Sequence, residues 1–154
     1  MGLMLELTSD NTENMISLGE RIGHSLSGGD VIELRGDVGA GKTTLTKGIA
    51  IGLGVDEDVQ SPSFTISRLY SARDGLSLAH YDFYRLNDPG IMADELNEAA
   101  GDDNVVTVIE WGGIVENVLP KDRLTISIIA VSENGRRLTL EASGNKGKRV
   151  LEKL

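Results

Sequence analysis

The residues with the strongest chemical character lie between positions 35 and 44, where the sequence reads RGDVGAGKTT. Gly36, Gly41, Lys42 and Thr43 match the spacing G-x-x-x-x-G-K-[ST] of the Walker A motif, or P-loop. Glycines let successive backbone N–H groups turn toward one anion, and a helix that starts at the loop aims its positive end at the same point. The motif therefore predicts a site for nucleotide phosphates.

Each residue of this loop has an expected task. Lys42 is predicted to reach the β and γ phosphates, Thr43 to offer its hydroxyl to Mg²⁺, and Thr44 to support the α phosphate. A glycine-rich turn that merely joins a strand to a helix is the alternative. The predicted nucleotide-binding residues of the loop are Gly36, Asp37, Val38, Gly39, Ala40, Gly41, Lys42, Thr43 and Thr44.

Two carboxylates follow apolar segments that read as strands. Asp82 lies in LAHYDFYRL and Glu110 in VVTVIEW. Active-site groups of open α/β sheets gather at the carboxyl ends of strands, so we expect both carboxylates to face the phosphates. With Lys42 they are the predicted catalytic residues, and with Thr43 they are the predicted metal ligands. The alternative is that each is an exposed loop carboxylate.

Other polar residues have weaker signals. Ser61, Ser63 and Thr65 in QSPSFTIS resemble a switch segment that supplies a hydroxyl to the metal, although an ordinary turn at this proline explains them as well. His24 and His80 are interpreted as structural histidines rather than ligands.

The motif alone does not choose among nucleotide-hydrolysing and nucleotide-transferring proteins. The sequence has no N-K-x-D motif for reading guanine and no D-x-x-G after a strand, so a GTPase is disfavoured. A small-molecule kinase stays open. It would need an acceptor pocket and usually an arginine-rich lid, whereas Arg68, Arg73 and Arg85 are scattered.

Hydrophobic periodicity predicts the elements that position these residues. Helices are expected after a cap at Ser9 or Thr12, over 42–54, and from Asp88–Pro89 onward. Asp74–Gly75 and Asn134–Gly135 are expected to turn two hairpins. The strands are predicted at 3–7, 31–34, 64–70, 76–84, 104–111, 123–131 and 136–143.

Together these elements predict an α/β fold, a P-loop NTPase-like three-layer sandwich whose mixed parallel and antiparallel sheet is flanked by helices. Residues 1–154 are expected to form a single domain. Its tail from about residue 144 is expected to form a short helix or to fray.

Composition limits the possible partners. The chain has 154 residues, no cysteine and a formal net charge of −9. It therefore has no disulfide partner and no thiolate metal site. An acidic surface argues against binding nucleic acid alone. No run of 18 apolar residues and no secretory signal is present, so we expect no membrane association and a cytoplasmic location.

Four motifs in order, GDVGAGKTTLTKGIAIGLG, VQSPSFTI, HYDFYRL and IEW, resemble the bacterial TsaE (YjeE) family over about residues 9–120. The resemblance implies a P-loop ATPase that needs ATP and Mg²⁺ and supports the TsaB–TsaD pair in making tRNA threonylcarbamoyladenosine, so that tRNA is reached indirectly. It implies that Asp82 is a Walker B-like carboxylate, that Glu110 is a second acid near metal or water, and that Trp111 lies beside the nucleotide. Many members continue IEW with proline and an acidic residue, where this chain has Gly112–Gly113, which predicts a looser loop.

Overall fold

The computed structural model describes residues 2–37, 39–60, 66–84 and 90–154, and within these residues seven strands form one sheet in the order β1-β7-β6-β2-β5-β4-β3. The central strand β2 (Val31–Arg35) has parallel neighbours in β5 (Val105–Glu110) and β6 (Leu124–Ala130). The other strands are β4 (Ser77–Asp82), parallel to β5, and β1 (Leu3–Ser9), β7 (Arg136–Ala142) and β3 (Ser67–Ser71), each antiparallel to its neighbours. The predicted mixed sheet is confirmed.

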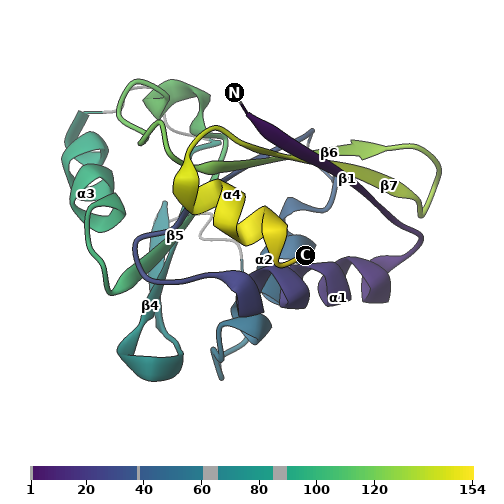
Figure 1. The fold of residues 1–154 in the computed structure, drawn as a ribbon, viewed down its shortest axis with the longest axis horizontal. Coiled ribbons are helices and arrows are strands. Elements are labelled where there is room, and N and C mark those ends of the chain that lie inside the picture. The colour runs from purple at the N-terminus through teal and green to yellow at the C-terminus, as the bar shows by residue number, and fades with distance from the viewer. Residues whose placement is uncertain (1, 38, 61–65, 85–89) are drawn as a thin grey trace.

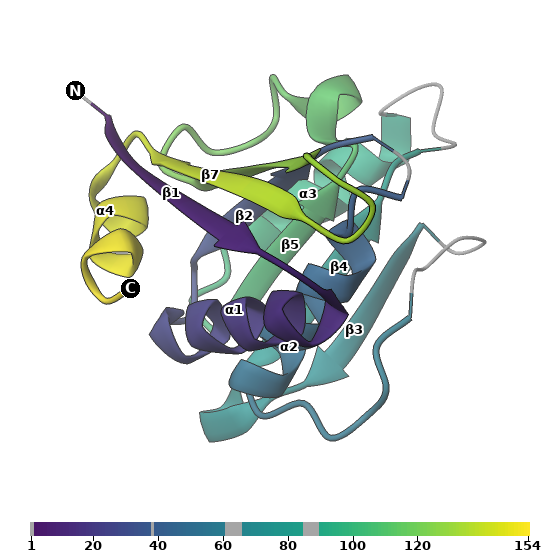
Figure 2. The same ribbon diagram turned by 90° about the vertical axis from the view of Figure 1, so that its right-hand side faces the viewer.

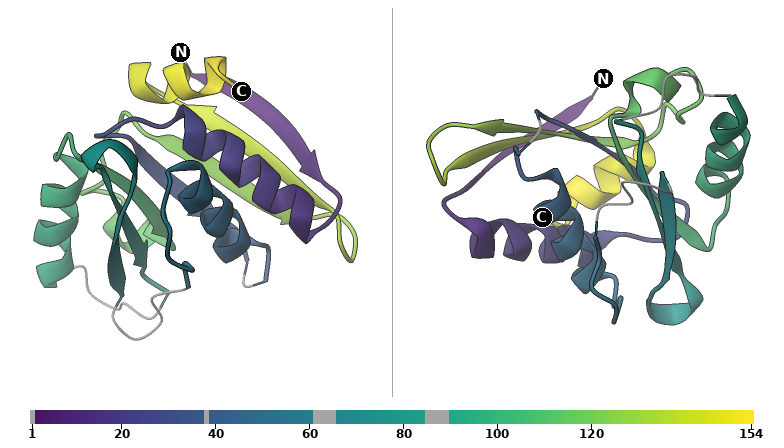
Figure 3. Two further views of the ribbon diagram at one scale, coloured as in Figure 1. Left: turned by 90° about the horizontal axis from the view of Figure 1, so that it is seen from below. Right: turned by 180° about the vertical axis from the view of Figure 1, so that it is seen from behind.

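Helices cover both faces of the sheet, as Figures 1 and 2 show. Helices α1 (Thr12–Ser25), α2 (Lys42–Gly52) and α4 (Asn145–Glu152) share one hydrophobic core with the sheet. Helix α3 (Gly90–Ala100) and the short 3₁₀ helix η2 (Gly112–Val115) lie over the other face, where a second core forms. The view from below in Figure 3 shows the three layers. The predicted three-layer sandwich is therefore confirmed.

The burial of the strands explains their places in the sheet. β2, β4 and β5 are buried along nearly their whole length, as expected for parallel strands covered on both faces. β6 and β7 instead alternate between buried and more exposed residues, because helices cover only one face of that half of the sheet. The half that carries the P-loop and the two predicted carboxylates is thus the more deeply enclosed half.

Helices α1 and α2 approach each other so closely that glycine is required on both. A Cβ atom added to Gly48 would lie 2.3 Å from the carbonyl oxygen of Ile16. One added to Gly19 would lie 2.5 Å from the carbonyl oxygen of Leu45. Gly23 and Gly52 repeat the arrangement one turn further along. Helix α2, which begins at the P-loop, therefore packs backbone to backbone against α1.

Arg73, in the turn between β3 and β4, holds the far ends of these two helices. Its guanidinium donates hydrogen bonds to the carbonyl oxygens of Gly52 at 2.5 Å and Leu26 at 3.0 Å. Its backbone N–H donates to the carbonyl oxygen of Leu53 at 2.8 Å. A cation is favourable at helix C-termini, where carbonyl groups lack helical partners. The β3–β4 hairpin is thereby fastened to α1 and α2 at the end opposite the P-loop.

Several local predictions can now be compared with the structure. The predicted cap of α1 at Ser9 or Thr12 is wrong. Asn11 is the cap, and its side chain accepts a hydrogen bond from the backbone N–H of Asn14 at 2.8 Å, while Ser9 ends β1. The tail forms helix α4, because Val150 and Leu151 bury their side chains against the sheet. The helix start predicted at Asp88–Pro89 lies outside the described residues. In the described ranges, no helix is both long enough and apolar enough to cross a membrane.

Candidate active site

The P-loop runs from the end of β2 at Arg35 to the start of α2 at Lys42. Gly39 and Gly41 have φ values of 83° and 112°, which side chains rarely adopt. A Cβ atom on Gly39 would meet nothing within 4 Å, so the loop is open at this residue. From β7, Arg136 Nε donates to the carbonyl oxygen of Ala40 at 3.0 Å and fixes the loop from outside. The glycines thus shape a concave backbone at the N-terminus of a helix, the geometry that binds anions.

Lys42 is the first residue of α2, and only 6% of its surface is exposed. Its Nζ donates to the carbonyl oxygens of Gly36 and, at 3.0 Å, Asp37. Burial lowers the pKa of this ammonium below its ordinary value of 10.5, because the charged form loses water. The carboxylates of Glu110 and Asp82 oppose that shift. A buried cation is therefore aimed along the loop, with two acids close enough to act on it electrostatically.

Asp82 and Glu110 end two neighbouring parallel strands. They are in register with each other, so both side chains project from the same face of the sheet. Glu110 is 2% exposed. Asp82 is partly buried, and its Oδ1 accepts a hydrogen bond from the backbone N–H of Tyr84 at 3.0 Å. The two acids therefore sit side by side at the carboxyl edge of the sheet, where the P-loop also lies.

One pocket of about 330 Å³ brings most of the predicted site residues together. Val38, Ser61, Ser63 and Thr65 lie outside the described residues, so the structure says nothing about their predicted roles. His24 lies exposed in the last turn of α1, away from this pocket. The pocket is lined by Gly39, Gly41, Lys42, Thr43, Thr44, Asp82, Tyr84, Glu110 and Trp111.

Trp111 follows Glu110 directly and turns the chain away from the sheet. Its backbone has φ 58° and ψ 45°, a left-handed conformation that is uncommon for a residue with a side chain. Its ring lies 4.1 Å from Lys42 Nζ and 5.0 Å from the ring of Tyr84, measured to the ring centroids. The residues after Trp111 form the 3₁₀ helix η2, and the greater looseness expected from Gly112–Gly113 stays a prediction. Trp111 is thus held against the lysine of the P-loop.

His80 contacts Glu110 behind the pocket. The side chain is fully buried, and its Nε2 lies 2.6 Å from Oε2 of Glu110. An ionised carboxylate only accepts hydrogen bonds, so a hydrogen bond to ionised Glu110 requires a hydrogen on Nε2 of the imidazole. The sequence predicted only that His80 is a structural histidine. Its contact with Glu110 was not predicted, because the two residues are 30 positions apart in the sequence.

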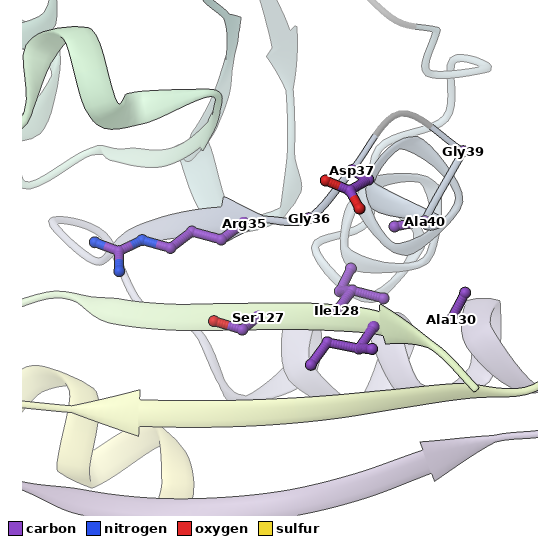
Figure 4. A pocket seen from close by; sticks show the side chains of 9 residues that line it. Arg35, Gly36, Asp37, Gly39, Ala40, Ser127, Ile128 and Ala130 are labelled. Atoms are coloured by element: carbon purple, nitrogen blue, oxygen red, sulfur yellow. The ribbon is translucent and has the colours of Figure 1, made fainter.

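A larger pocket of about 440 Å³ lies on the β6 side of the loop (Figure 4). Gly36, Asp37, Gly39 and Ala40 line it from the loop, and Ser127–Ala130 line it from β6. Figure 4 shows the Arg35 side chain pointing along the sheet and away from the loop. Ile128 lies on β6, beneath the loop in this view. Lys42, Thr43 and Glu110 do not line this pocket. The smaller pocket is therefore the better candidate for phosphate chemistry, despite its size.

A third pocket, of about 220 Å³, shares Gly39, Gly41 and Thr44 with the site. Asn11 and Thr12 line it at the start of α1, and Asn134 and Arg136 line it from the β6–β7 hairpin. The sequence marks Asn134 only as a turn residue and Asn11 only as a neighbour of possible caps. Nothing local shows that both meet at the P-loop, because that depends on the order of strands in the sheet.

The residues of the site fit a magnesium nucleotide. Mg²⁺ in such sites takes one or two protein carboxylates, with phosphate oxygens and water completing its ligands. Thr43, Asp82 and Glu110 supply a hydroxyl and two carboxylates around one pocket. In the described part of the chain, no three His, Cys, Asp or Glu side chains gather as a metal cluster of their own. This donor set suits a metal that arrives with a nucleotide.

Comparison with known proteins shows the family of this chain. The family model for the threonylcarbamoyl adenosine biosynthesis protein TsaE matches residues 9–138. The chain is 43% identical over 129 residues to the tRNA threonylcarbamoyladenosine biosynthesis protein TsaE of Bacillus subtilis, covering 82% of this chain and 78% of the relative. It is 44% identical over 116 residues to the protein of the same name from Streptomyces coelicolor, covering 74% and 78% respectively.

A solved structure agrees with these relatives. The crystal structure of Bacillus subtilis YdiB superimposes with a TM-score of 0.81 and 35% identity, covering 99% of this chain and 94% of that one. The similarity therefore extends over the whole sheet and all of the layers described above, not only over the P-loop.

Proposed function

The chain belongs to the TsaE family of tRNA threonylcarbamoyladenosine biosynthesis proteins, and we propose that within this pathway it is a Mg²⁺-dependent ATPase that sustains turnover of a TsaB–TsaD complex. Its expected location is the cytoplasm, where tRNA is modified.

One observation carries the proposal. A buried lysine and a buried glutamate, Lys42 and Glu110, face the same pocket at the N-terminus of a helix. Burying charge is costly unless the charge has a partner or a task. The Lys42 ammonium contacts backbone carbonyl oxygens, which a phosphate would replace as stronger, charged acceptors. Binding of an anion with several oxygens should therefore lower the free energy of the site.

The chain's own groups divide the work on the nucleotide. Backbone N–H groups of residues 39–44 and Lys42 bind the phosphates and stabilise the charge that develops on the γ phosphate. Glu110 or Asp82 would orient the attacking water, and the other acid with Thr43 would hold the metal. When bound, Mg²⁺ neutralises negative charge on the β and γ phosphates.

The nucleoside is expected to extend from Thr44 into the neighbouring 220 Å³ pocket, between Asn11 and Asn134. The two pockets share Gly39, Gly41 and Thr44, so one nucleotide can fill both. Asn11 and Asn134 side chains offer both donors and acceptors to a base or a ribose.

Multiple-turnover tRNA modification tests the proposal. TsaB–TsaD is supplied with excess tRNA and ATP, and modified tRNA is measured with the wild type, with Lys42→Ala, or with no added protein. We expect repeated turnover only with the wild type. Equal turnover with Lys42→Ala would show that the protein is a scaffold whose nucleotide chemistry is irrelevant. Rapid phosphorylation of a metabolite by the isolated protein would instead establish a small-molecule kinase.

A further inference from the structure

His80 occupies a position that an apolar residue would be expected to fill. It lies on β4, two residues before Asp82, and projects toward the face of the sheet that α2 covers. Its neighbours on that face include Leu78, Val106 and Val108, all fully buried. None of the imidazole is exposed, and among the described residues no group bonds its Nδ1.

Stability alone does not explain a polar pair at this position. Burying an imidazole and a carboxylate together gains little over two apolar side chains, and apolar replacements of buried polar pairs are often neutral or stabilising. Glu110 has a reason to be there, because it lines the phosphate pocket. His80 does not line that pocket, so any task it has must act through Glu110.

We propose that His80 is a positioning residue, which holds Oε2 of Glu110 so that the carboxylate presents Oε1 to the pocket in one fixed orientation. The proposal rests on the proposed ATPase function. A glutamate side chain has three rotatable bonds, and its carboxylate would otherwise sample several orientations. The 2.6 Å contact removes that freedom before a nucleotide binds. Groups of this kind behind a metal or a reacting water typically change affinity or rate by about 10–100-fold.

The contact also explains why histidine suits this position. The hydrogen bond must come from a donor two residues up a neighbouring strand, which requires a side chain that reaches sideways across the sheet. An imidazole reaches with its Nε2 and has only two side-chain torsions to fix. Glutamine can place an amide N–H at nearly the same point, whereas leucine fills the volume without a donor.

The test compares His80→Leu with His80→Gln, alone and combined with Glu110→Gln. Thr107→Val is the matched control: Thr107 is a fully buried polar residue on β5, and its hydroxyl has no hydrogen-bond partner among the described residues. The kcat and KM for ATP are measured together with nucleotide affinity from the fluorescence of Trp111, the only tryptophan in the sequence.

We expect His80→Leu to lower kcat about 10–100-fold while KM and ADP affinity without Mg²⁺ change less than about 3-fold. His80→Gln should recover most of the lost kcat, and Thr107→Val should match the wild type. In the Glu110→Gln background, His80→Leu should cause no further loss, because both changes then remove the same contribution. Independently of activity, NMR of ¹⁵N-labelled histidine should show a hydrogen on Nε2 of His80, with a resonance that shifts in Glu110→Gln and not in Thr107→Val.

The results separate this inference from the proposed function. If the wild type hydrolyses ATP and Glu110→Gln does not, but His80→Leu keeps its kcat within about 3-fold, the positioning role is wrong and the ATPase function stands. Losses that multiply in the double variant, or a hydrogen on Nδ1 instead of Nε2, would also overturn it. If His80→Leu does not fold, His80→Gln in the same cycle and the NMR measurement decide. A wild type without nucleotide binding would overturn the proposed function itself.

Discussion

Replacing Gly48 with alanine should separate two helices that now touch through their backbones. The new Cβ would lie 2.3 Å from the carbonyl oxygen of Ile16 and 2.9 Å from the Cα atom of Gly19. Ordinary contacts begin at 3.4 Å, so the backbones must move apart by about 1.1 Å. No side-chain rotation relieves the clash, because both contacts are to backbone atoms.

The expected loss follows from two opposing terms. Overpacking a core costs typically about 1–3 kcal/mol, and backbone contacts place this site at the upper end. Alanine gains about 1 kcal/mol over glycine within a helix, which offsets part of that cost. We therefore expect the free energy of unfolding to fall by about 2 kcal/mol, which for a chain of this size lowers Tm by roughly 4–8 °C.

Urea denaturation of Gly48→Ala and of a matched control measures this loss. The control is Gly101→Ala at the end of α3, where the nearest atom would lie at an ordinary 3.4 Å. It should change the stability by less than about 0.5 kcal/mol. If Gly48→Ala were as stable as Gly101→Ala, the close approach of α1 and α2 would not be required by packing, and the reasoning from these distances would be refuted.

Four further predictions follow from the site and the core. ATP should compete for binding better than GTP in a Trp111 fluorescence titration; equal affinity would refute an adenine preference. Lys42→Ala should weaken ATP binding by about 1.5–3 kcal/mol. Glu110→Ala should keep most of the ATP affinity but lower kcat. Normal ATP hydrolysis by Glu110→Ala would show that Glu110 has no part in the mechanism. Burial raises the pKa of Tyr81 from 10.0 to about 12, so its stabilising contribution is complete below pH 10 and disappears as pH rises through 12. An ultraviolet titration should show an ionisation near pH 12 that is absent from Tyr81→Phe; the same titration curve from both proteins would contradict the assignment. Arg73→Ala should lower the free energy of unfolding by about 2–3 kcal/mol, because it removes charged hydrogen bonds to two helix ends. Arg73→Lys should lower it less. Equal stability of the wild type and both variants in urea would contradict this prediction.

The sequence was sufficient to predict the parts of the site that local chemistry determines. The P-loop needs glycine at set positions and a lysine at the first turn of a helix, and these requirements are contiguous in the chain. The positions of Asp82 and Glu110 were predictable for a related reason, since each ends an apolar strand and parallel strands bring their carboxyl ends to one edge. The side-by-side register of the two acids is a direct consequence. Their catalytic and metal-binding roles stay predictions.

Residues that depend on distant pairing were not predictable. The β6–β7 hairpin could be read from Asn134–Gly135, but its meeting with the P-loop requires β6 to lie beside β2, a choice made by packing of the whole sheet. The contact between His80 and Glu110 depends in the same way on the pairing of β4 with β5. The prediction of a cap at Ser9 or Thr12 failed for a smaller reason. Several neighbouring residues can cap a helix, and because β1 extends to Ser9, the cap falls at Asn11.

Arg73 connects the two elements that carry Lys42 and Asp82, because it lies in the turn before β4 and bonds the C-terminal end of α2. Helix α2 extends from the end that Arg73 contacts to Lys42, and β4 extends from the turn after Arg73 to Asp82. Lys42 and Asp82 therefore both lie far from Arg73, at the opposite end of these elements. Pairing with β5 fixes Asp82 beside Glu110, while the hydrogen bonds of Arg73 fasten the C-terminal end of α2 to the β3–β4 turn. Exposed hairpin turns usually accept inserted residues. Here an insertion between Arg73 and β4 would displace the Arg73 guanidinium from the two helix ends that it bonds, so this turn should tolerate insertions less well than an ordinary exposed turn.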